Sequence, residues 1–252
     1  MEYFIRGAHS SYAKQGVFYA PDSAHCPRIS MLRSLCWNQP VGETSAFTFA
    51  LGLASETLFK KVFPEALTDV ATEFNITDKV KFMGHADGLV NDTVYELKSV
   101  SSTRTAEQII VDKEPKLGNV LQLLGYMLSL QKQKGMLRYT NYVYHTMTRK
   151  KEKVKLEPCN IDFPVEISDE GNVYVAGKLQ DFTIENVMES LQIIARHLED
   201  GTLPHEPVKG DEYWNCCSMC ALRAACPMVQ SLQELIEAAS RVGFIHSELT
   251  RA

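Results

Sequence analysis

The sequence has no run of apolar residues long enough to cross a membrane. A spanning helix needs about 20 consecutive apolar residues, and no stretch of the 252-residue chain approaches that length. The segment Met1–Gly7 carries one acid and one base and does not have the pattern of a secretory signal. We therefore expect a protein without membrane contact that stays in the cytoplasm.

An excess of basic residues is also missing, since 26 Lys and Arg stand against 31 Asp and Glu, for a net charge of -5. This argues mildly against a protein that coats nucleic acid, because phosphate binding depends on Lys and Arg. Net charge does not describe a local groove, however, and bound cations offset the charge of acidic metal sites. One run is locally basic, and it predicts either a solvated hairpin or a contact with a DNA backbone: Lys132, Lys134, Arg138, Arg149, Lys150, Lys151, Lys153 and Lys155.

Internal repeats, low-complexity tracts and a Gly-x-x-x-x-Gly-Lys-Ser/Thr phosphate loop are absent, so the chain contains no helicase motor. Apolar spacing predicts helices over 27–37, 45–63, 117–131, 182–199 and 229–242, and strands over 72–80, 81–90, 93–100, 137–147 and 173–175. In the helix 45–63, Phe49, Leu53, Leu58 and Val62 are the expected core face. The order of elements predicts an α/β fold with a mixed central sheet flanked by helices.

The two strands 81–90 and 93–100 are separated only by Asn91-Asp92, a composition typical of a two-residue hairpin turn. If Val90 pairs with Thr93, counting outward places Asp87 opposite Glu96. The same count places His85 opposite Lys98. Side chains alternate along a strand, so these four side chains share one face of the predicted hairpin.

Two carboxylates that face each other about 5 Å apart repel unless a cation lies between them. Mg²⁺ or Mn²⁺ prefers such oxygen ligands, and the carbonyl of Leu97 is a further candidate ligand. Lys98 points at the same place and could orient a water molecule or stabilise charge on a phosphate. The alternative is an edge hairpin with solvated charges, but apolar residues flank both strands and favour a buried position.

Asp87 followed by Glu96-Leu97-Lys98 resembles the core motif of the RecB-type PD-(D/E)XK nucleases. Gln122 and Tyr126 form the Gln-x-x-x-Tyr pattern that this family carries on the next helix, and four-residue spacing puts them on one helical face. The resemblance implies a restriction-endonuclease-like fold and an upstream acidic metal ligand. Glu56 is the candidate, where the family often has His; alternatively it forms an ordinary surface pair with Lys60.

Seven cysteines in a chain without an export signal do not indicate a disulfide framework. Cys217, Cys220 and Cys226 give three ligands from one short segment, and Cys26 could supply the fourth. This layout resembles the iron–sulfur members of the RecB-type nucleases, including the CRISPR-associated RecB-like exonucleases, and implies a 4Fe–4S cluster. A zinc site made from the local cysteines, Cys216 included, is the alternative, and so are free thiols. Cys36 and Cys159 are expected to be small buried side chains.

The resemblance implies a DNA nuclease that uses Mg²⁺ or Mn²⁺, with a 5′ to 3′ exonuclease activity on single strands, in DNA recombination and repair or in CRISPR systems. A helicase, recombinase or CRISPR integrase would then be a separate protein. We expect an N-terminal segment 1–44 contributing Cys26, a nuclease core 45–200, and a small C-terminal cysteine-rich iron–sulfur subdomain 201–252. The competing classes are a non-catalytic DNA-binding or adaptor protein with the same fold and a zinc-stabilised protein of unrelated function.

Overall fold

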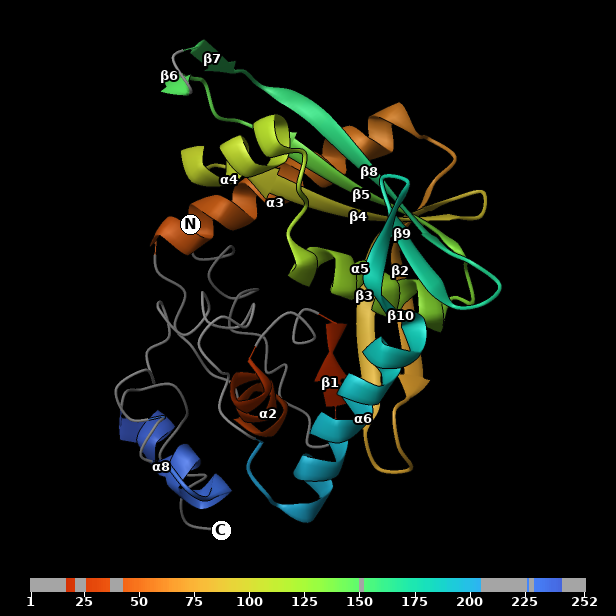
Figure 1. Ribbon diagram of the computed structural model, residues 1–252, viewed down its shortest axis with the longest axis vertical. Coiled ribbons are helices and arrows are strands. Elements are labelled where there is room, and N and C mark those ends of the chain that lie inside the picture. Colours follow the sequence, from red (N-terminus) through yellow and green to blue (C-terminus); the bar gives the residue numbers. More distant parts are fainter. Residues whose placement is uncertain are drawn as a thin grey trace. The chain divides into compact units, whose positions relative to one another are not determined.

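The computed structural model describes residues 17–20, 26–36, 43–149, 152–204, 226 and 229–241 (Figure 1). The chain forms two compact units. The first comprises Met1–Val41, Glu73–Gly84 and Asn186–Ala252, and the second comprises Gly42–Thr72 and His85–Glu185. No helix among these described residues is long and apolar enough to cross a membrane.

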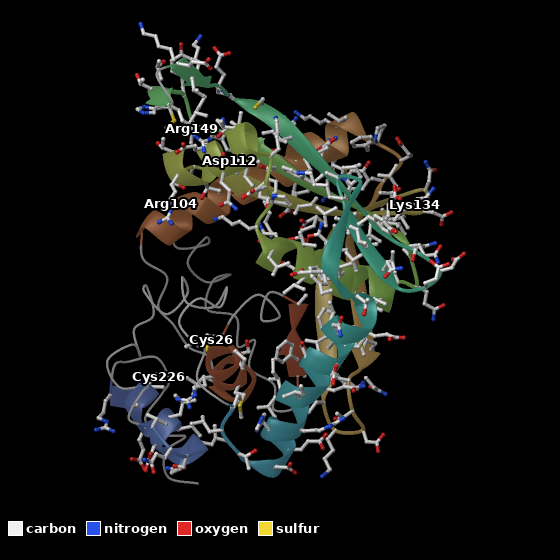
Figure 2. All side chains as sticks on the ribbon, in the orientation of Figure 1. Cys26, Arg104, Asp112, Lys134, Arg149 and Cys226 are labelled. Atoms are coloured by element: carbon white, nitrogen blue, oxygen red, sulfur yellow. The ribbon has the colours of Figure 1, made fainter. Side chains whose placement is uncertain are left out.

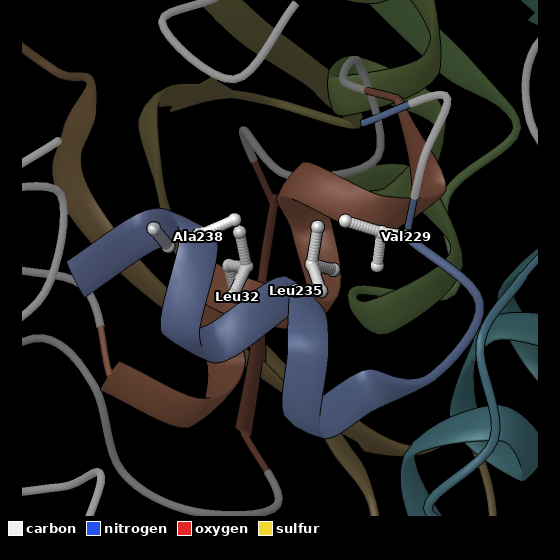
Figure 3. Close-up of a cluster of buried hydrophobic side chains, with 5 residues drawn as sticks. Leu32, Val229, Leu235 and Ala238 are labelled. Carbon is white, nitrogen blue, oxygen red and sulfur yellow. The ribbon is translucent and has the colours of Figure 1, made fainter. Parts of the chain in front are cut away.

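The first unit joins segments from near both ends of the chain in one apolar core. Strand β1 (Val17–Tyr19) pairs in parallel with Lys81–Met83, and helices α2 (Pro27–Cys36), α6 (Ile184–Asp200, from Asn186 on) and α8 (Leu232–Arg241) complete the described elements. In α8, Leu235, Ala238 and Ala239 recur at helical spacing and are buried against Leu32 of α2 and Val229 (Figure 3). The burial of this shared apolar stripe holds α2 and α8 together.

The second unit is built on a mixed sheet. Its strands run in the order β3–β4–β5–β8–β9–β10, and only the β4–β5 pair is parallel. The elements of this region are α3 (Glu43–Val62), β2 (Leu67–Asn75), β3 (Lys81–Val90), β4 (Thr93–Val100), α4 (Thr103–Glu107), the π-helix η2 (Gln108–Asp112), α5 (Leu117–Ser129), β5 (Lys134–Asn141), β6 (His145–Arg149), β7 (Glu152–Leu156), β8 (Cys159–Ile167), β9 (Asn172–Val175) and β10 (Lys178–Thr183).

The side chains of β4 alternate between the two faces of the sheet, and a helix covers each face. On one face the ring of Tyr95 lies 5.0 Å from that of Phe59 in α3. On the other face Lys98 donates a hydrogen bond to Gln122 of α5. The predicted α/β fold with a mixed sheet flanked by helices is therefore confirmed, and it places the predicted site on the face that α5 covers.

The hairpin strands β3 and β4 have the bounds that the sequence predicts, but two other strands differ. The strand expected at 72–80 lies earlier, at Leu67–Asn75, and the strand expected at 137–147 is divided into β5 and β6. Asn141 explains the division, since its amide donates to the carbonyls of Val143 and Glu157 at 3.0 and 2.7 Å. These side-chain bonds stabilise a break in the strand that apolar alternation does not reveal.

The core face expected for α3 is wrong. Leu53, Leu58 and Val62 are 50%, 51% and 63% exposed, whereas Ser55 and Phe59 are buried; the side chain of Phe49 lies outside the described residues. Phe59 of the helix and Phe63, the residue after its last one, both pack against Tyr95. Aromatic contacts with one strand thus decide which side of this helix faces the sheet, although aliphatic residues are frequent on the other side.

Gly88 and Gly52 provide a matched test of this packing. A Cβ atom at Gly88 would lie 2.5 Å from the Phe59 ring, whereas one at Gly52 in α3 would meet nothing within 4 Å. We expect Gly88→Ala to lower the free energy of unfolding by about 1–3 kcal/mol through overpacking. Gly52→Ala should raise it by up to about 1 kcal/mol, because alanine favours helix. Denaturant unfolding of the two variants measures both effects, and equal stabilities would contradict the packing described.

Candidate active site

The β3–β4 hairpin turns at Asn91-Asp92, and Val90 pairs with Thr93, as the sequence predicts. Asn91 has a φ of 53°, a left-handed conformation that Asn tolerates better than most residues. The register continues to the Gly88–Tyr95 pair. Beyond it, the amide of Leu97 donates to the Asp87 carboxylate with an N···O distance of 2.6 Å. This bond fixes the carboxyl group of Asp87 beside the strand that carries Glu96.

The carboxyl groups of Asp87 and Glu96 lie against each other inside the protein. Burial and the charge of Glu96 together raise the pKa of Asp87 to about 8. Burial also raises the pKa of Glu96, which the ammonium group of Lys98 opposes. Glu96 is only 2% exposed, and its Oε2 atom has no hydrogen-bond donor among the described residues. Two facing acids, one buried and one partly buried, are unfavourable unless a proton or a cation is shared.

A chain of polar contacts extends from Glu96 to α5. Lys98 forms an ion pair with Oε1 of Glu96 and donates to Oε1 of Gln122 at 3.0 Å. Gln122 in turn donates from its Nε2 to the hydroxyl of Tyr126 at 2.9 Å. Burial alone would lower the pKa of Lys98, but the Glu96 carboxylate outweighs it, so this pKa lies above its usual value. The structure therefore brings Asp87, Glu96, Lys98, Gln122 and Tyr126 into one network.

Asp87 and Glu96 fit a divalent cation, because the uncompensated Oε2 atom and the facing carboxyl group are hard oxygen ligands. Glu56 does not complete a cluster with them. Among the residues that the structure describes, no three His, Cys, Asp or Glu side chains are grouped so as to hold a metal ion. Glu56 comes from α3, and it is near enough to the pair for its charge to raise the pKa of Glu96. Burial and then the charge of Asp87 raise the pKa of Glu56 itself.

His85 does not lie opposite Lys98, contrary to the count from the turn. Its ring nitrogen Nδ1 contacts the carboxylate of Asp69 at 2.8 Å, and both side chains are exposed. Asp69 belongs to β2, which also pairs with β3. The β3–β4 pairs run from Val90–Thr93 to Gly88–Tyr95 and do not include His85 with Lys98. The contact that the structure shows for His85 is therefore with β2.

The cysteine site is described only in part. Cys26 is buried and Cys226 is partly buried, and both lie in the first unit (Figure 2). The other predicted ligands, Cys217 and Cys220, lie outside the described residues, as does Cys216. Cys159 is exposed on β8, contrary to the expectation of a buried side chain.

Arg28, two residues after Cys26, was not predicted from the sequence and connects α2 to the C-terminal cysteine segment. The guanidinium group donates to the carbonyl of Cys226 at 2.7 Å and contacts its Sγ atom at 3.4 Å. It also donates to the carbonyl of Pro204 at 3.0 Å. The position of Arg28 beside Cys26 was the only sequence feature that could have indicated this role.

A mixed sheet whose hairpin presents two acids and a lysine to one face defines the class of protein: nucleases with an Asp and a Glu-x-Lys motif on adjacent strands. The sequence pattern of the PD-(D/E)XK nuclease superfamily matches residues 44–227. The chain belongs to the PD-(D/E)XK nuclease superfamily. This membership does not distinguish the iron–sulfur or CRISPR-associated members from the others.

One solved structure shares this fold, and two others have lower similarity scores. The crystal structure of SSO0001 is similar with a TM-score of 0.54 at 17% identity, over 90% of this chain and 93% of that one. An alkaline exonuclease, LHK-Exo from Laribacter hongkongensis, has a TM-score of 0.46 at 13% identity, over 79% of this chain and 95% of its own. A phage-related exonuclease from Haemophilus somnus 129PT has a TM-score of 0.40 at 11% identity, over 60% and 68%. No curated protein sequence matches the chain.

The raised pKa of Asp87 predicts how stability depends on pH. Its pKa is about 8 in the folded protein but about 4 in an unfolded chain. Between these pH values the folded state holds a proton that the unfolded state releases, so stability of the metal-free protein falls as pH rises. Asp87→Asn removes this effect while keeping an acceptor for Leu97. We expect it to be more stable than wild type in EDTA, by on the order of 2–4 kcal/mol at pH 8.

Thermal or denaturant unfolding of both proteins between pH 4 and pH 8 measures this difference. It should shrink to a small value at pH 4, where Asp87 is protonated in the folded protein and about half-protonated in the unfolded chain. The control is Asp92→Asn, since Asp92 is exposed on the same hairpin and pairs with Lys132. Equal stability of wild type and Asp87→Asn at every pH would rule out the described pair of buried acids.

Proposed function

We propose that this protein is a metal-dependent DNA nuclease that hydrolyses phosphodiester bonds with Asp87, Glu96 and Lys98. The observation that carries the proposal is the pair of facing carboxyl groups, Glu96 buried and Asp87 partly buried, with a lysine bound to Glu96 and to Gln122. An acidic pair of this kind weakens the fold in the absence of a cation, so its presence is best explained by function. Membership in the nuclease superfamily supports the same reaction.

Asp87 and Glu96 would hold Mg²⁺ or Mn²⁺, with the carbonyl of Leu97 and the side chain of Glu56 as further candidate ligands. Such a cation polarises a phosphate and lowers the pKa of water. Lys98 would orient the attacking water or offset negative charge on the phosphate. Gln122 holds the ammonium group from the side opposite Glu96, and Tyr126 fixes the amide of Gln122. These two residues would therefore position Lys98 rather than take part in proton transfer.

The proposed substrate is single-stranded DNA, degraded from its ends, with 5′ to 3′ polarity. The resemblance of the Asp87, Glu96 and Gln122 motifs to RecB-type nucleases supports this choice. A helicase, recombinase or CRISPR integrase would act as a separate partner protein. Linear and circular single strands distinguish exonuclease from endonuclease activity, and labels at either end determine polarity.

A 4Fe–4S cluster held by Cys26, Cys217, Cys220 and Cys226 is the second part of the proposal. Cys26 and Cys226, separated by most of the chain, belong to the same compact unit. Arg28 contacts the Sγ atom of Cys226, and a guanidinium group offsets the negative charge of thiolate ligands. A cluster would tie the chain ends together, and its role would be structural because phosphodiester hydrolysis transfers no electrons. Zinc on the same thiolates is the alternative.

We expect Asp87→Asn, Glu96→Gln and Lys98→Met each to lower DNA cleavage by at least about 100-fold, because each removes charge from the metal site or from the transition state. Initial rates on end-labelled single-stranded DNA with Mn²⁺ measure the effect. Asp92→Asn is the matched control, since Asp92 is an exposed acid on the same hairpin, and it should cleave at the wild-type rate.

A folded wild-type protein without metal-dependent cleavage of DNA would contradict the enzymatic proposal and favour the non-catalytic DNA-binding class. Wild-type activity in all three variants would contradict the assignment of the site alone. Circular dichroism and thermal unfolding establish that each variant is folded before rates are compared.

Cys26→Ser should lose iron and acid-labile sulfide from anaerobically purified protein, because thiolates are the ligands that such clusters require. Cys159→Ser is the control, as Cys159 is exposed on β8 in the other unit, and it should keep full iron content. Thermal unfolding should show a lower Tm for Cys26→Ser only, since the cluster closes a very long loop. If the wild type contains stoichiometric zinc and no iron, the cluster proposal is wrong and the cysteines bind zinc instead.

A further inference from the structure

Strands β6 and β7 form a two-stranded hairpin that pairs with no other described strand (Figure 1). Cross-strand partners share a face, so the pairs divide the hairpin into two faces. One face carries the pairs His145–Leu156, Met147–Val154 and Arg149–Glu152. The other carries Thr146–Lys155 and Thr148–Lys153.

The first face anchors the hairpin. Leu156 is buried, and Met147 and Val154 are half-buried. Arg149 forms ion pairs with Asp112 of η2 at 2.5 Å and with Glu107 of α4 at 3.5 Å (Figure 2). An arginine that bridges two acids on a neighbouring helical segment restricts the orientation of the hairpin. Arg149 is therefore a structural residue, although it belongs to the basic run.

The second face is polar and exposed. All four of its side chains, the two threonines and the two lysines, are exposed. Lys155 lies 5.2 Å from the ring centre of Tyr144, which is 66% exposed, and forms an exposed ion pair with Glu157. Exposed ion pairs contribute little and exchange readily for other anions. Hydroxyl, ammonium and aromatic groups thus lie together, the combination with which proteins bind single-stranded nucleic acids.

The hairpin leaves the sheet at the strand ends where the candidate active site lies. Strands β4 and β5 are parallel, with Lys98 opposite Tyr139 and Val100 opposite Asn141, so the two strands end side by side. The hairpin begins four residues after Asn141, and four residues span at most about 14 Å. The hydroxyl of Tyr142 in this connection contacts Ser55 at 2.9 Å, which fixes the connection to α3.

We propose that the outer face of the β6–β7 hairpin binds the DNA strand outside the cleavage site, with Lys153 and Lys155 on its phosphates and Tyr144 stacked on a base. The inference rests on the proposed nuclease function and adds a binding surface to it. Charge complementarity supports a nucleic acid as the occupant: four of the six residues from Lys150 to Lys155 are basic in a chain of net charge -5. The hairpin would hold the strand while Asp87 and Glu96 act on its end.

Binding of a fluorescent 20-nucleotide oligo-dT in EDTA, measured at several salt concentrations, separates the two kinds of contact. Lys153→Ala/Lys155→Ala should lower the slope of log affinity against log salt by about 1.4, which is about 0.7 for each lost phosphate contact on a single strand. Tyr144→Ala should weaken binding by about 5- to 100-fold with the slope unchanged, because stacking involves no charge.

The control is Lys79→Ala/Lys178→Ala, which removes two exposed lysines from other elements and should bind as wild type does. All variants should unfold at the wild-type temperature, since the altered side chains are exposed. If the lysine variant keeps the wild-type affinity and slope while wild type binds and cleaves DNA, the hairpin proposal is overturned and the proposed function stands. If wild type neither binds nor cleaves DNA, the proposed function itself fails.

Discussion

Two acids that face each other close to a tight turn, one buried and one partly buried, are the constraint on which the rest of the site depends. Asp87 and Glu96 lie on adjacent strands; burial raises the pKa of both, and the charge of Glu96 raises that of Asp87 further. Neither would be favourable in the interior of an ordinary protein. The surrounding contacts are arranged to hold them: the amide of Leu97 binds Asp87, and Lys98 binds Glu96. The two acids therefore lower the stability of the fold, and a bound divalent cation would offset this cost.

The neighbouring helices act on this constraint from opposite faces of β4. Helix α5 contributes Gln122, which holds Lys98 toward Glu96, and Tyr126, which holds Gln122. Helix α3 contributes Phe59, whose packing against Tyr95 supports the strand from behind. Lys98 is therefore held on both sides, by Glu96 and by Gln122. A positioned lysine beside a pair of carboxylates is well suited to charge that develops during phosphate hydrolysis.

Charge is distributed unevenly over the chain, and contacts decide what each basic residue does. Arg28 is buried and donates hydrogen bonds to the carbonyls of Pro204 and Cys226, which links α2 to the C-terminal segment. Arg149 forms ion pairs with Asp112 and Glu107. Lys153 and Lys155 remain on an exposed face. The basic residues of one sequence run can therefore be assigned to structural or surface roles only when their contacts are known.

The sequence by itself determined the hairpin and the face shared by Asp87, Glu96 and Lys98, because strand alternation and a two-residue turn are local geometry. It also determined the superfamily, since the motif residues keep their order along the chain. Only the tertiary structure decided that α3 buries Phe59 rather than Leu53, that His85 turns to Asp69, and that Arg28 reaches Cys226. Those choices depend on partners distant in the chain, and periodicity within one segment contains no information about them.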